Sequence, residues 1–187
     1  DGEVYVCAAD KDNASIVFNA ALSMLDQCPY LKKRAKIKAS QRVIVDKVTH
    51  TVFKVLSAEA YSKHGYKPIC VIFDELHAQP NRDLWDIMTF GSGSARKQPV
   101  YIVLTTAGDD PDRNSIGWEI HEKARKIYEY RHGNKEYADN PIWLPFIWGL
   151  GGDYEKIKNI DIFDENVWYQ CNPSLGITID IDVLRSE

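Results

Sequence analysis

The sequence predicts an α/β fold, a three-layer sandwich in which helices cover both faces of a mostly parallel sheet. Two apolar runs at 69–73 and 100–104 carry this prediction, because continuous runs rich in β-branched residues are typical of strands buried on both faces of a parallel sheet. A helical pattern follows each run, and the separation between the runs leaves room for one crossover helix. We therefore expect the two strands to lie side by side in the middle of the sheet.

The remaining elements follow from periodicity and from capping residues. Apolar runs predict further strands at 4–9, 43–45, 51–55 and 142–148. Pro145 demotes the last of these to an edge strand or an irregular one, since proline cannot donate to a sheet. Helical spacing predicts helices at 14–25, 83–90, 115–132 and 164–170, and a helical turn at 57–63. Asp10 or Asp12 can cap the first helix and Asn81 the second.

Length and composition predict one globular domain over residues 1–187. The chain is 44% hydrophobic, which is enough to bury a full core, and its net charge of -4 gives no global basic field for a polyanion. The four cysteines lie far apart with no C-x-x-C pair, which favours reduced thiols and a cytosolic setting. We find no membrane span or leader in the sequence. Because the chain begins at Asp1 just before a strand, we expect it to be part of a longer protein.

The most basic stretch of the chain, between Lys32 and Lys38, has two interpretations. Five of its seven residues are lysine or arginine. Such a run is commonly a solvated edge of the fold, and it is also suited to contact a phosphate backbone. The sequence leaves both alternatives open.

Two carboxylates, Asp74 and Glu75, end the first apolar strand and form the main candidate site. Burying a lone charge is costly, so we expect both to emerge at the carboxyl end of the strand, where open α/β sheets bind ligands. Adjacent acids there suit a Walker B site for ATP. Asp74 would hold Mg²⁺, directly or through water, and Glu75 would orient and deprotonate the water that attacks the γ-phosphate. The alternative is a strand that runs into an acidic turn without chemistry.

Four segments in this order and spacing resemble the ATPase half of a tailed-bacteriophage terminase large subunit: VIFDELHAQP at 71–80, ARKQP at 95–99, LTTAG at 104–108 and NPSLG at 172–176. The resemblance implies a RecA-like P-loop NTPase fold of the ASCE class, here without its first strand and P-loop. It also implies an ATP-driven DNA-packaging motor that is joined to a nuclease domain in the complete protein.

The resemblance assigns roles to single residues. It implies that Asp74 is the Mg²⁺ ligand, that Glu75 is the catalytic base, and that a coupling segment links hydrolysis to DNA movement, with residues Thr105, Thr106, Ala107 and Gly108. Arg82 and Arg96 are candidates for an arginine finger or sensor. His77 either senses the γ-phosphate or orients its loop; the alternative is a loop histidine with a backbone partner.

The resemblance further implies ATP and Mg²⁺ as cofactors, and double-stranded DNA, the terminase small subunit and the portal protein as partners. It implies a homo-oligomeric ring on the procapsid, in the cytoplasm of the host bacterium. No Gly-Lys-Ser/Thr turn occurs in the chain, so the main phosphate cradle is missing, and we expect these residues alone to be inactive. Two alternatives remain: a helicase-like ATPase, because Asp-Glu-Leu-His fits a D-E-x-H pattern, and a non-catalytic remnant or assembly module.

Overall fold

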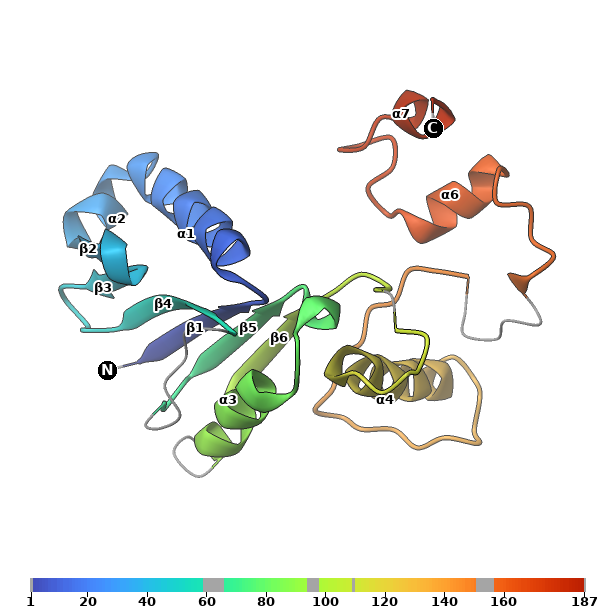
Figure 1. Ribbon diagram of the computed structural model, residues 1–187, viewed down its shortest axis with the longest axis horizontal. Coiled ribbons are helices and arrows are strands. Elements are labelled where there is room, and N and C mark those ends of the chain that lie inside the picture. Colours follow the sequence, from blue (N-terminus) through green and yellow to red (C-terminus); the bar gives the residue numbers. More distant parts are fainter. Residues whose placement is uncertain (1, 59–65, 94–97, 109, 151–156, 187) are drawn as a thin grey trace. The chain divides into compact units, whose positions relative to one another are not determined.

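The computed structural model describes residues 2–58, 66–93, 98–108, 110–150 and 157–186, and the chain forms two compact units, 1–120 and 121–187 (Figure 1). The first unit contains all the strands of the described residues. The second consists of helices and irregular segments. None of the described helices has both the length and the apolar character that a membrane crossing needs.

A six-stranded mixed sheet organises the first unit, in the order β2-β3-β4-β1-β5-β6. Its strands are β1 (Glu3–Ala8), β2 (Ala35–Lys38), β3 (Val43–Asp46), β4 (Val52–Ser57), β5 (Cys70–Asp74) and β6 (Val100–Leu104). Strands β4, β1, β5 and β6 are parallel neighbours, whereas β3 pairs antiparallel with both β2 and β4. The predicted parallel pairing of the two apolar runs is confirmed, although β6 is the last strand of the described sheet and only β5 lies inside it.

Helix α1 (Lys11–Asp26) covers one face of this sheet. The Asp10 side chain caps it by accepting hydrogen bonds of 2.8 Å from the backbone N–H groups of Asp12 and Asn13, which have no partner inside the helix. Phe18 packs with other buried side chains of the helix and the sheet in one apolar cluster, whose members are Val6, Ala8, Ala14 and Val55. The helix predicted for 14–25 is confirmed and begins three residues earlier.

Helix α3 (Asp83–Gly93) covers the opposite face. Asn81 Oδ1 accepts a hydrogen bond of 2.9 Å from the backbone N–H of Asp83, as expected for its predicted cap. The Trp85 ring packs on Phe73 of β5 with 4.7 Å between centroids. Because Phe73 and its neighbour Ile72 point to opposite faces of β5, and Ile72 joins the α1 cluster, the two helices lie on opposite sides. The predicted three-layer arrangement is therefore present in the first unit.

The second unit contains one long helix and two short ones among its described residues. Helix α4 (Ile116–Arg131) begins in the first unit and extends into the second, where it ends before Gly133, whose φ of 110° is accessible to glycine at low cost. The acidic groups of Glu122 and Glu129 both pair with Arg125 along this helix. Helices α6 (Glu165–Cys171) and α7 (Ile181–Arg185) follow, each capped by the aspartate that precedes it.

Two differences from the predicted elements stand out. The strand predicted for 142–148 is wrong: these residues form a turn and irregular backbone, and their large side chains are exposed at Ile142, Leu144, Phe146 and Trp148. Pro145 explains the outcome, because it removes a donor that a strand would need. Helix α2 (Pro29–Arg34), strand β2 and helix α7 were not predicted. The turn predicted for 57–63 lies mostly outside the described residues.

Candidate functional site

The polar ends of β5 and β6 meet at one edge of the sheet. Asp74 and Leu104 are register partners in a parallel pair, so the residues that follow them, Glu75 and Thr105, leave the sheet together at its carboxyl edge. Asp74 is half-buried, and the Glu75 side chain is 43% exposed. Glu75 has a φ of 52° and a ψ of 52°, a left-handed conformation that is uncommon for glutamate and that turns the chain sharply into a short 3-10 turn, Leu76–Ala78.

His77 of this turn connects the acid pair with the segment after β6. Its ring nitrogen Nδ1 lies 3.0 Å from Thr105 Oγ1, 3.4 Å from Thr106 Oγ1 and 3.3 Å from Glu75 Oε2. Its backbone N–H also donates to Thr105 Oγ1, at 3.1 Å. The partners of this ring nitrogen are thus side chains, and the role of His77 stays a prediction. The structure brings together Glu75, His77 and two residues of the predicted coupling segment.

Two glycines pack so closely on His77 that neither position has room for a side chain. A Cβ added to Gly108, whose φ is +67°, would lie 2.7 Å from the Cβ of His77. A Cβ added to Gly117, in the first turn of α4, would lie 2.8 Å from the Cα of His77. Gly117 was missed in the sequence. Its signal is a glycine inside a helical pattern, which costs about 1 kcal/mol relative to alanine and usually has a packing reason.

The residues at this edge fit a magnesium ion. Mg²⁺ prefers oxygen ligands and is commonly held by one or two carboxylates, with water and substrate phosphates completing its shell. Asp74 supplies carboxylate oxygens of this kind at the end of β5. No group of three or more His, Cys, Asp or Glu side chains placed to hold a metal occurs among the described residues, so the chain offers a partial shell.

Gln79 is a second residue that the sequence did not single out. It follows the 3-10 turn and is buried, yet neither its Oε1 nor its Nε2 has a hydrogen-bond partner. A buried amide left unpaired costs about 1–3 kcal/mol, so such a group requires an explanation. Gln79 lies four residues after Glu75 in the chain.

The two arginine candidates are not equivalent. Arg82 is exposed but engaged, since its guanidinium donates to Asp86 at 2.9 Å and to Glu119 at 3.1 Å. These contacts, the Asp86 hydrogen bond first, raise the pKa of Arg82. The structure therefore places Arg82 in an ion-pair cluster and shows no contact of its side chain with the acid pair. Arg96 lies outside the described residues.

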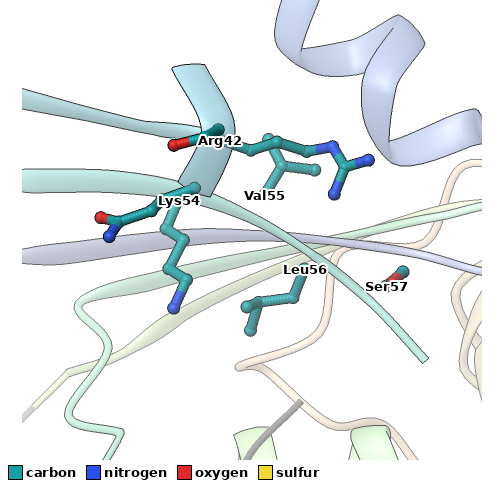
Figure 2. A pocket seen from close by; sticks show the side chains of 7 residues that line it. Arg42, Lys54, Val55, Leu56 and Ser57 are labelled. Atoms are coloured by element: carbon teal, nitrogen blue, oxygen red, sulfur yellow. The ribbon is translucent and has the colours of Figure 1, made fainter. Parts of the chain in front are cut away.

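A separate polar pocket of about 440 Å³ lies beside β4 and does not include any predicted site residue (Figure 2). Figure 2 shows Arg42 and Val55 on one side of the strand and Lys54 and Leu56 on the other. Arg42 donates to Ser15 Oγ at 2.9 Å, so its charge is directed at helix α1. The two cations of the pocket do not converge, and the carboxyl edge of β5 and β6 remains the candidate site.

Comparison with known proteins places the chain in a family. The family model described as "Terminase large subunit, ATPase domain" matches residues 1–126. The chain belongs to this family. It is 30% identical over 172 residues to the terminase large subunit of Enterobacteria phage HK97, an alignment that covers 90% of the chain and 30% of that protein. The chain therefore spans about a third of the length of this relative.

Solved structures agree on the fold of this terminase ATPase family. The large terminase of bacteriophage HK97 superimposes with a TM-score of 0.75 at 23% identity, over 99% of this chain and 35% of that one. The ATPase domain of the large terminase of Thermus phage P74-26 gives a TM-score of 0.55 at 15% identity, over 97% of this chain and 73% of that one. The resemblance to terminases is thereby confirmed, as is the predicted RecA-like fold class, and the family match favours a terminase over a helicase.

Proposed function

We propose that this chain is part of an ATP-driven DNA-packaging motor of a terminase large subunit and that it carries the Walker B acids and the coupling segment. The family match and the HK97 relative support this proposal. The observation that carries it furthest is the meeting of Glu75, His77 and Thr105 at one carboxyl edge of the sheet. This is the edge at which open α/β sheets bind ligands.

The two acids would have different roles. Asp74 leaves the buried strand first, with its carboxylate half-buried, and would hold Mg²⁺, which when bound neutralises charge on the phosphates. Glu75 is turned out of the strand by its left-handed backbone and its side chain is 43% exposed, which suits a base that must reach a water molecule. Glu75 would orient that water and accept its proton. Thr105, Thr106, Ala107 and Gly108 would pass the change at the site to the DNA-moving parts.

The phosphate-binding loop would come from another segment of the parent protein. Strand β6 has a free edge in the described sheet, and one of its faces exposes Val100, Ile102 and Leu104. The chain covers only 30% of the HK97 relative, and a parent of that length would have enough further sequence to supply a strand and loop there. Without that loop, the β- and γ-phosphates lack their backbone N–H cradle, and we expect these residues alone to bind and hydrolyse ATP poorly.

The wider assignment follows the family. We propose that residues 1–187 belong to one motor domain, joined in the complete protein to a nuclease domain. The partners would be double-stranded DNA, the terminase small subunit and the portal protein, with the large subunits arranged as a ring in the cytoplasm of the host bacterium. An arginine acting in trans would come from outside the Arg82 cluster, because that guanidinium is already paired.

The test compares two substitutions in the full-length protein. Glu75→Gln keeps the shape of the side chain and removes the base, so ATP binding should survive while turnover falls by about 10²–10⁴-fold. Asp74→Ala removes an anionic ligand, so Mg²⁺-dependent nucleotide binding should itself weaken. Steady-state ATPase rates and equilibrium ATP binding, measured on both variants, separate the two defects.

Two results would overturn the assignment. If the Glu75→Gln enzyme hydrolyses ATP at the parent rate, these acids are not a Walker B pair. If the parent itself neither binds nor hydrolyses ATP, and its gene encodes no Gly-Lys-Ser/Thr turn, the protein is a non-catalytic remnant.

A further inference from the structure

We propose that His77 is a positioning residue of this site, and that its Nδ1 atom ties the Glu75 carboxylate to the hydroxyl of Thr105 so that the base and the coupling segment stay in fixed register. The inference rests on the proposed function, because it assigns a role within the same site. It adds a residue whose effect passes through Glu75 and Thr105 and not through contact with the nucleotide.

The contacts of one ring atom carry the inference. Nδ1 lies within 3.0 Å of Thr105 Oγ1 and 3.3 Å of Glu75 Oε2, two oxygens from the ends of different strands. A second bond, from the backbone N–H of His77 to the same Thr105 hydroxyl, fixes that oxygen from another direction at 3.1 Å. The acid pair and the coupling segment, separated by about thirty residues in sequence, are thus joined through a single side chain.

The other hydrogen bonds of Thr105 show that the ring nitrogen Nδ1 of His77 is the donor. A threonine hydroxyl offers one donor and two acceptor positions. Thr105 Oγ1 donates to the Thr106 carbonyl at 3.2 Å and accepts the His77 backbone N–H, which leaves one acceptor position for the ring. A carboxylate only accepts, so both Thr105 and Glu75 require a proton on Nδ1. Removal of this one donor therefore frees Glu75 from the ring and leaves Thr105 with only its bond from the His77 backbone N–H and its bond to the Thr106 carbonyl.

The surroundings of His77 keep the ring in place. Gly108 and Gly117 approach its side chain and its backbone so closely that an added Cβ at either would lie under 3.0 Å from a His77 atom. The side chain of His77 is only 25% exposed. A residue confined on both sides by backbone can hold its partners to a fraction of an ångström, which is what a catalytic base requires.

The experiment substitutes His77 in the full-length protein. Asparagine places its amide near the position of Nδ1, glutamine reaches further, toward Nε2, and alanine removes both. We expect His77→Ala to lower kcat for ATP by about 10- to 100-fold with KM changed less than about twofold, because misplacement of a base costs turnover and not binding. His77→Asn should recover most of the loss, and His77→Gln should not. The ATP consumed per length of DNA packaged should rise in the alanine and glutamine variants.

Controls separate this role from a structural one. His50 lies on an exposed turn with a φ of 56°, which asparagine tolerates, so His50→Asn is the matched control and should leave kcat unchanged. Equal activity of the His77→Asn and His77→Gln enzymes would overturn the inference, because position would then not matter. A parental kcat in His77→Ala would also overturn the inference if Glu75→Gln is inactive. The proposed function would then remain, because Glu75 would still be required. Parental activity of Glu75→Gln would remove both.

Discussion

Strands β2 and β6 form the two edges of the described sheet, and their side chains differ in kind. β2 is four residues long, and Lys36 and Lys38 flank its exposed Ile37. β6 carries no charge and exposes Val100, Ile102 and Leu104, at 53, 41 and 53%. Sheet edges that face water are usually short and charged, which prevents pairing with other chains. β2 meets that description, whereas β6 has the composition of a strand that another segment covers.

The basic run between Lys32 and Lys38 overlaps strand β2, and two of its charges are paired. Arg34 makes two hydrogen bonds with Asp46 of β3, at 3.1 and 2.5 Å, and Lys32 lies 2.8 Å from Asp26. Part of the positive charge is therefore used to fix the end of the hairpin. This geometry supports the solvated-edge alternative over the phosphate contact.

The largest difference in stability between the two edges is expected when a lysine is placed on β6 and on β2. In the full-length protein, Ile102→Lys should destabilise the fold by about 2–4 kcal/mol, because a covering segment would bury the ammonium group without a partner. Ile37→Lys, the matched change on β2, should stay within about 0.5 kcal/mol. Thermal unfolding of both variants checks the difference. If Ile102→Lys is as neutral as Ile37→Lys, β6 is an edge that faces water in the complete protein.

The pH dependence of stability sharpens the description of the β2 side. The hydrogen bonds from Arg34, and after them those from Thr49, hold the pKa of Asp46 well below its usual range. A lowered pKa means that the carboxylate stabilises the fold above about pH 4, its unfolded value, and that this contribution is lost as the pH falls toward the folded value. Arg34→Met should therefore lower stability at neutral pH and flatten its decline in acid.

Urea midpoints between neutral pH and about pH 2 measure this effect in the parent and the variant. Lys32→Met is the control, because its pair with Asp26 is highly exposed, and exposed pairs contribute little. Parallel pH curves for the parent and Arg34→Met would show that this pair does not hold the hairpin.

The smallest effect is expected from the edge lysines themselves. The double substitution of Lys36 and Lys38 by alanine should change stability by no more than about 0.5 kcal/mol, since both side chains are exposed. Self-association, followed by sedimentation, should rise instead, with Lys33→Ala as the control on helix α2. A loss of DNA affinity with a reduced salt slope would favour the phosphate-contact alternative.

The sequence predicted those parts of the fold that local pattern determines. The apolar runs of β5 and β6, the cap at Asp10 and the cap at Asn81 are each specified by a few neighbouring residues, and all are present. Strand β2 escaped notice because alternating lysines resemble a solvated loop, and its pairing with β3 depends on partners further along the chain. The apolar content of 142–148 was misleading, since Pro145 and the surrounding irregular backbone outweighed it.

The sequence predicted the candidate residues of the site but not the hydrogen bonds between them. Asp74 and Glu75 follow from the end of an apolar strand, and the threonines from the end of the next. The bond between His77 and Thr105 spans 28 positions, and no local pattern encodes which hydroxyl meets which ring nitrogen. Gly117 shows the same limit, because its reason for being glycine is the backbone of His77.

The left-handed backbone at Glu75 sets stability against activity at one position. A non-glycine residue in this conformation costs about 1–2 kcal/mol, and one of the residues that bear this cost is the residue proposed as the base. Glycine or asparagine would adopt the same turn with less strain. Selection for thermal stability alone would therefore favour replacement of Glu75, and selection for the proposed catalysis would oppose it. If natural relatives keep glutamate at this strained position, the residue is retained for function, because stability alone would favour glycine or asparagine there.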